Sequence, residues 1–149
     1  MKISTKGRYA LRLMLDLASS EPGTYISLKD ISARQEISDK YSEQIINQLG
    51  KAGFVRSIRG SRGGYALAGK PEDYTVGMVL RLMEGSLAPV ACVETADNPC
   101  GRAEQCVTAE VWEQIHQAVN GIVDNITLAD LLKRQEEKFK ASVKVASPK

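Results

Sequence analysis

The chain has 149 residues, enough for one domain of typical size whose hydrophobic core needs no disulfides. Hydrophobic residues make up 43% of the chain and charged residues 26%, a balance that excludes a wholly disordered or fibrous protein. The chain contains no run of about eighteen apolar residues, so no membrane span is predicted. Its first residues lack the apolar core of a signal peptide. We therefore expect a cytoplasmic protein without a membrane partner.

Charge is distributed unevenly between the two halves of the chain. Residues 1–65 hold eleven Lys or Arg and six Asp or Glu, a net charge of +5, whereas residues 66–149 hold nine and twelve, a net charge of −3. A basic half joined to a mildly acidic half is typical of a module that binds a polyanion and carries a sensing or assembly region. The alternative is that both sets of charges merely solvate the surface.

The N-terminal third of the chain predicts three helices. Residues 4–20 place apolar side chains at helical spacing. Ser27 and Asp30 form a capping box that begins a short second helix, and Ser38 caps a third helix, which ends near Ala52. Two short helices joined by a tight turn, with a polar face on the second of them, are the layout of a helix-turn-helix DNA-binding motif.

The third predicted helix carries polar side chains beside an apolar stripe that includes Ile45 and Leu49. In a helix-turn-helix this polar face enters the major groove, where Gln can pair with adenine and Glu can accept a hydrogen bond from cytosine. The residues expected to read bases are Lys40, Tyr41, Ser42, Glu43 and Gln44. The cations expected to contact phosphate are Lys6, Arg8, Lys51 and Arg56.

A β-hairpin is predicted directly after these helices. Residues 54–58 alternate like a strand, and residues 65–67 can pair with them across the basic, glycine-rich segment 59–64. Arg59 and Arg62 in this tip can pair with phosphates or enter a narrow A/T-rich minor groove. A plain solvated turn is the alternative. The fold class predicted is mainly α: a winged helix-turn-helix with a small β-hairpin wing and a long dimerisation helix.

Every cysteine of the chain lies in one irregular stretch, which follows an amphipathic helix predicted near residues 76–83. Cys92, Cys100 and Cys106 have the spacing C-x7-C-x5-C. A disulfide framework does not suit a cytoplasmic chain with an odd number of cysteines. The grouping favours ligands of a soft metal or an iron-sulfur cluster, or a redox thiol switch. Coincidence is the alternative.

A long amphipathic helix is predicted from about Glu110. Because the winged domain has a core of its own, the wide apolar face of this helix is expected to pack against a second copy of the chain. The residues that define the face are Val111, Ile115, Ala118 and Ile122. A last helix is predicted from Thr127 to about Lys138.

These elements predict four parts in the chain. Residues 1–84 form the DNA-binding domain, 85–108 a cysteine-bearing sensor loop, 109–138 the dimerisation helices and 139–149 a flexible tail. No catalytic site is recognisable, because His116, the one histidine, has no nucleophile or carboxylate constellation around it in the pattern. We therefore expect no enzymatic activity and no small-molecule substrate.

Four groups of residues along the chain match a known family in order and spacing: Ser4–Ala10, Tyr41–Ile45, Arg59–Leu67, and the three cysteines followed by Trp112 and Asn125–Leu128. They cover about residues 1–137, and they closely resemble the IscR family. That family consists of homodimeric winged-helix bacterial transcription regulators, among them iron-sulfur and nitric-oxide sensors and a cysteine-metabolism regulator without a cluster. The resemblance implies a homodimer that binds a pseudo-palindromic double-stranded DNA operator.

The resemblance also implies that Cys92, Cys100 and Cys106 bind an iron-sulfur cluster, which we expect to be 2Fe-2S rather than 4Fe-4S. The first gap is longer than the five residues usual in the family. Ala109 stands where the IscR branch has histidine, and Arg8 stands where the nitric-oxide branch has aspartate, so the fourth ligand is unassigned. The candidates are an external thiol, water, or one of Glu94, Glu104 and Glu110. A cluster-free thiol sensor or a partner-controlled regulator of the same fold is the alternative.

Overall fold

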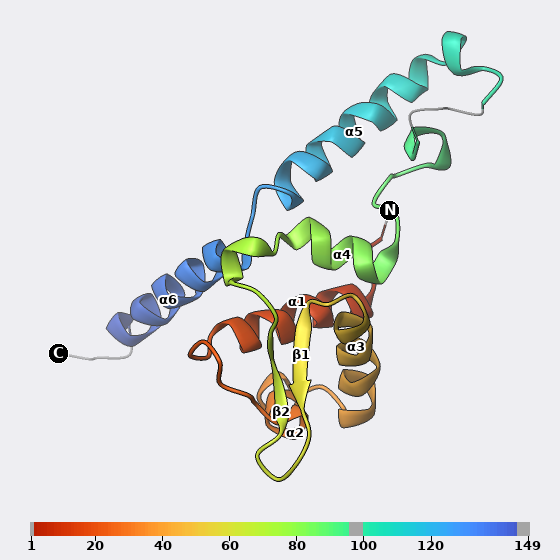
Figure 1. Cartoon of the computed structure of the whole chain (residues 1–149). Coiled ribbons are helices and arrows are strands. Elements are labelled where there is room, and N and C mark those ends of the chain that lie inside the picture. The colour runs from red at the N-terminus through yellow and green to blue at the C-terminus, as the bar shows by residue number, and fades with distance from the viewer. Residues whose placement is uncertain (1, 96–99, 146–149) are drawn as a thin grey trace.

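The computed structural model describes residues 2–95 and 100–145, with side chains up to residue 143. It confirms a mainly α fold with a two-stranded antiparallel hairpin (Figure 1). Its α-helices are α1 (Thr5–Ala18), α2 (Leu28–Gln35), α3 (Asp39–Lys51), α4 (Val76–Glu84), α5 (Val107–Val123) and α6 (Leu128–Val145). The hairpin consists of β1 (Val55–Ile58) and β2 (Gly64–Leu67), and short 3-10 turns form η1 (Pro71–Asp73), η2 (Ala91–Val93) and η3 (Ala103–Gln105).

Hydroxyl side chains begin the first four α-helices. Ser4, Ser27, Ser38 and Thr75 each accept a hydrogen bond from the backbone N–H three residues further on. Each such cap contributes about 1 kcal/mol relative to alanine, because it satisfies an amide that the helix leaves unpaired. The caps predicted at Ser27 and Ser38 are confirmed, and they set where the two helices of the helix-turn-helix begin.

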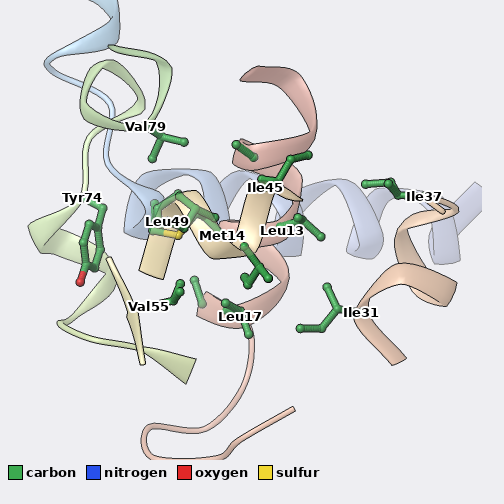
Figure 2. Packing of buried hydrophobic residues seen from close by; sticks show 14 residues of the cluster. Leu13, Met14, Leu17, Ile31, Ile37, Ile45, Leu49, Val55, Tyr74 and Val79 are labelled. Atoms are coloured by element: carbon green, nitrogen blue, oxygen red, sulfur yellow. The ribbon is translucent and has the colours of Figure 1, made fainter. Parts of the chain in front are cut away.

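The hydrophobic core lies between α1, α2 and α3 and the elements that return to cover them (Figure 2). Leu13 of α1 is fully buried beside Ile31 of α2 and Ile45 of α3. Val79 of α4 and Leu128, the first residue of α6, are equally buried in the same cluster. Aliphatic side chains from both ends of the chain therefore share one core.

Helix α6 differs from the expectation in its length and in its contacts. We expected it to end at about Lys138, with a flexible tail beyond, whereas the structure continues the helix to Val145. The reason is that residues 138–145 include no glycine or proline, and the first helix breaker is Pro148. Along this length α6 contacts α1 and η1. The four-part division of the chain remains a prediction, with α6 packed on the winged domain.

The predicted hairpin is confirmed, with Val55 opposite Leu67 and Ile58 opposite Gly64. A third piece of extended chain joins it, because the Ile26 and Tyr65 backbones exchange hydrogen bonds of 2.9 and 2.8 Å. A Cβ atom on Gly64 would overlap the backbone of Ile26. The close approach of these two backbones explains why a glycine stands at this position of the wing.

Helix α5 extends away from the winged body (Figure 1), and η2 contacts it. Each described residue of α5 is at least partly exposed. None of the described helices combines the length and the apolar character that crossing a bilayer requires.

Candidate DNA-binding surface and cysteine segment

The polar face of α3 presents three of the five predicted base-reading side chains. Lys40, Glu43 and Gln44 are exposed in the first two turns, after the Ser38 cap. They stand opposite Ile45 and its buried neighbours, because successive residues of a helix are rotated by about 100°. This part of α3 can therefore enter a major groove N-terminus first, as a recognition helix does.

Two of the five residues are placed differently from the prediction. Ser42 is 0% exposed, and its hydroxyl has no hydrogen-bond partner among the described residues. It lies one turn before Ile45 and Ile46, on the face of α3 that packs against the core, so the prediction that it faces DNA is wrong. Tyr41 is half-buried, and its ring packs edge-on against Tyr9 of α1, with 5.8 Å between the ring centres.

The wing presents its two arginines to solvent. Arg59 and Arg62 are exposed in the turn between β1 and β2. Gly60 has a φ of 113°, and a Cβ atom on Gly63 would overlap the Ile58 carbonyl. The glycines therefore allow a tight turn that carries two guanidinium groups at its tip, a shape suited to a nucleic-acid backbone or a minor groove.

The three cysteines lie on the chain that joins α4 to α5, which we call the cysteine segment (residues 85–106). Cys92 is half-buried in η2, Cys100 is exposed, and Cys106 is half-buried at the residue before α5. In the described part of the chain, no three His, Cys, Asp or Glu side chains are grouped closely enough to hold a metal ion. The structure therefore places the predicted ligands on one segment but does not gather them at one point.

The apolar face predicted for dimerisation is exposed on α5. Val111 is 49% exposed, Ile115 37% and Ile122 60%. These side chains lie along one side of the helix, and Val107 extends the same side to the cysteine segment with 74% exposure. An apolar stripe this long is typical of a surface that a second chain covers.

Helix α4 holds the C-terminal end of α5 through a polar junction. The Arg81 guanidinium donates to the Asp124 carboxylate at 2.6 and 3.0 Å and to the Asn120 amide oxygen at 2.6 Å. This guanidinium keeps the pKa of Asp124 below its usual value. The backbone N–H of Val76 donates to Ile126 across the same junction. These contacts anchor the C-terminal end of α5 to α4, whereas the rest of the helix contacts η2.

A family model for the iron-dependent transcriptional regulators called Rrf2 matches residues 3–134. The chain belongs to the Rrf2 family. It is therefore a DNA-binding transcription regulator, which confirms the sequence-based expectation of a winged-helix regulator rather than an enzyme. The resemblance to the IscR group is confirmed as well, because proteins of that name occur among the relatives and the solved structures.

Three relatives show the range of proteins to which this Rrf2 chain is similar. The protein rrf2 of Nitratidesulfovibrio vulgaris is 42% identical over 134 residues, which are 89% of this chain and 88% of that protein. The structure of T. potens IscR has a TM-score of 0.75 and 43% identity, covering 93% of this chain and 90% of that one. The structure of CymR, the global cysteine regulator of B. subtilis, has a TM-score of 0.76 and 39% identity, covering 90% and 98%.

Cys106 lies beside groups that stabilise its thiolate. Its Sγ atom lies 3.3 Å from the Thr108 hydroxyl. That hydrogen bond, followed by the backbone N–H of Ala109, lowers the pKa of Cys106. Both groups belong to the first turn of α5, where unpaired amides favour a negative charge.

We expect Cys106 to react with iodoacetamide at a lower pH than an ordinary cysteine, because the thiolate is the reacting form. In a protein carrying Cys92→Ala and Cys100→Ala, the alkylation rate followed by mass spectrometry should reach half of its maximum at a lower pH than in an unstructured peptide with one cysteine. Adding Thr108→Val removes the hydroxyl and should move this midpoint to higher pH. An unchanged midpoint in the Thr108→Val protein would contradict the assigned cause.

Sequence reasoning missed the polar side chains that hold the elements together. Arg81 and Asp124 are 43 residues apart, and no motif marks them as a pair. Gln48 is a polar residue of α3, but its side chain turns toward α4 and donates to the Leu82 carbonyl. Each of these contacts joins two helices that are distant in the chain. Neither could be predicted without knowing which helices pack against each other, and that is a property of the tertiary structure.

Proposed function

We propose that this Rrf2-family chain is a homodimeric regulator whose cysteine segment senses iron-sulfur cluster status or oxidative or nitrosative stress and thereby sets its affinity for operator DNA. The position of the three cysteines carries the proposal. They lie outside the core, on the chain that links the winged domain to the exposed apolar helix α5. A chemical change in this segment can therefore shift the equilibrium between two arrangements of the winged domains in the dimer.

In the first form of the proposal, Cys92, Cys100 and Cys106 bind an iron-sulfur cluster, with 2Fe-2S preferred over 4Fe-4S. The chemistry of the donor set supports it, because thiolates on one short segment repel one another unless they are protonated, oxidised or bound to a cation. The arrangement of the described residues does not fit a preassembled site. The segment would thus have to close around the cluster as it binds, and the fourth ligand is left open.

Anaerobic purification tests this form directly. We expect visible absorption together with bound iron and acid-labile sulfide. If the cysteines act as one site, Cys92→Ala, Cys100→Ala and Cys106→Ala should each abolish the colour and the iron, whereas the neighbouring control Val93→Ala should retain both. A colourless, iron-free protein that stays so after reconstitution with iron and sulfide would refute cluster binding.

The second form is a cluster-free regulator of the cysteine-metabolism type, controlled by thiol redox state or by a partner protein. The lowered pKa of Cys106 favours the redox variant, because a thiolate is the species that oxidants attack. Treatment of the metal-free protein with peroxide should then produce a reversible Cys100–Cys106 disulfide that changes DNA affinity. The disulfide would be identified by mass spectrometry. Its absence would exclude this redox switch and favour control by a partner protein.

DNA reading is proposed to use α3 and the wing together. Three exposed side chains of α3 can contact base edges: Lys40, Glu43 and Gln44. The exposed part of the half-buried Tyr41 side chain can contact DNA beside them. With Ser42 buried, the operator contacts of this helix are confined to these residues and those further along its exposed face. A homodimer would present two such helices to a pseudo-palindromic site.

Arg59→Ala is expected to weaken DNA binding by roughly 1 kcal/mol more on a site with A/T-rich flanks than on one with G/C-rich flanks, because a narrow minor groove concentrates negative potential around an inserted guanidinium. The measurement is fluorescence anisotropy with two duplexes that share a core obtained by in vitro selection. The control Arg134→Ala, an exposed arginine on α6, should change neither affinity. Equal losses on both flanks would make Arg59 a phosphate contact only.

A further inference from the structure

Gln48 belongs to the recognition helix, but its side chain is used inside the protein. Its Nε2 atom donates a hydrogen bond of 2.7 Å to the Leu82 carbonyl in the last turn of α4, and the contact is partly buried. Carbonyls in the last turn of a helix have no amide of the same helix to bond. The Gln48 amide therefore caps α4 from a helix that is 34 residues earlier in the chain.

A second contact holds the same turn of α4 from the start of α1. The Glu84 carboxylate accepts hydrogen bonds from the Ser4 backbone N–H at 3.0 Å and from the Ser4 hydroxyl at 2.6 Å. Ser4 is the N-cap of α1 and is followed by Lys6 and Arg8, two of the predicted phosphate contacts. Both α3 and α1 are thus tied to residues 82–84.

The cysteine segment begins at the very next residue. Gly85 ends α4 with a φ of 80°, a conformation that favours glycine, and the chain leaves there toward Cys92. The last turn of α4 therefore lies between the helix that reads DNA and the chain that carries the cysteines. A movement of the segment at Gly85 acts on the carbonyl that Gln48 holds.

We propose that Gln48 is a positioning residue that couples the recognition helix to the last turn of α4, so that DNA binding and the conformation of the start of the cysteine segment affect each other. The coupling must be reciprocal, because an effect of one site on the other implies the reverse effect. The inference rests on the DNA-binding role of the family and holds whether the segment binds a cluster or acts through its thiols.

Hydrogen exchange of the full-length protein tests this coupling without any cofactor. The probe is a duplex enriched by in vitro selection with the wild-type protein, used at a concentration that saturates each variant. In the wild type, DNA should slow amide exchange in residues 83–87 about threefold or more, since bound DNA holds α3 and α3 holds this turn. In Gln48→Leu, which keeps the bulk but has no donor, the slowing at residues 83–87 should be clearly smaller than in the wild type, while α3 itself remains protected by DNA.

Matched variants separate coupling from a loss of fold or of affinity. Gln114→Leu makes the same substitution at an exposed position of α5 and should leave the slowing at residues 83–87 intact. Gln48→Lys restores a donor and should restore it. If Gln48→Leu does not fold, Gln48→Glu replaces the donor by an acceptor at the same length and should reduce the slowing in the same way. Slowing that is equal in the wild type and these donorless variants, or absent from the wild type, would overturn the proposal.

Discussion

Leu128→Ala should lower the free energy of unfolding by about 3 kcal/mol, because removing a fully buried leucine loses transfer free energy and leaves a cavity. Leu128 is 0% exposed and lies in the cluster with Leu13 and Leu49, which belong to the winged domain. The substitution would therefore destabilise the DNA-binding part, although it is made at the start of α6 near the end of the chain.

Urea unfolding followed by circular dichroism, at one fixed protein concentration, measures this loss. The control is Leu132→Ala, which removes the same atoms one turn later, where the side chain is only half-buried. Its cost should be clearly smaller. Equal costs for the two variants would show that α6 does not contribute its first residue to the shared core.

Ile122→Glu should convert the proposed homodimer to a monomer at micromolar concentration. The Ile122 side chain is 60% exposed in the single chain, so a carboxylate there costs the fold of one chain little. In a two-fold symmetric dimer the substitution occurs twice, and each carboxylate would lose water without gaining a partner. DNA affinity should fall at least about tenfold, because the two half-sites would then be bound independently.

Sedimentation velocity measures the oligomeric state, and fluorescence anisotropy with the selected duplex measures the affinity. Gln114→Glu is the matched control, since it adds the same charge at an exposed polar position of the same helix. It should remain dimeric and bind DNA like the wild type. A dimeric Ile122→Glu protein with unchanged affinity would place the dimer contact elsewhere on the chain.

The elements that local chemistry controls could be predicted from the residues alone. Ser27 and Ser38 begin helices because a hydroxyl at that position satisfies an amide three residues on, whatever the rest of the chain does. The hairpin follows from alternating side chains around a glycine-rich turn, and the predicted pairing of its two strands is confirmed. The three cysteines and the exposed side of α5 were likewise visible as patterns, and their order in the chain places them beyond the winged domain.

The direction of individual side chains depended on neighbours that are distant in the chain. Ser42 is polar and stands among base-reading candidates, but α1 packs against that face of α3 and buries it. Gln48 turns to α4 because an unpaired carbonyl is brought within reach there. Residues beyond Lys138 continue α6 because helical residues without a breaker propagate a helix that α1 already supports.

The cysteine segment shows most clearly the difference between what the sequence predicts and what the tertiary structure decides. Sequence spacing identifies Cys92, Cys100 and Cys106 as a set, because soft donors grouped in one irregular segment are unusual in a chain without disulfides. Whether those donors meet is a matter of tertiary structure, since a loop takes its shape from the elements at its ends rather than from its own residues. Here those ends are the last turn of α4 and the first turn of α5. Composition and periodicity therefore determine the helices, the wing and the chemical type of each site, and packing between distant elements decides which groups reach DNA, the core or one another.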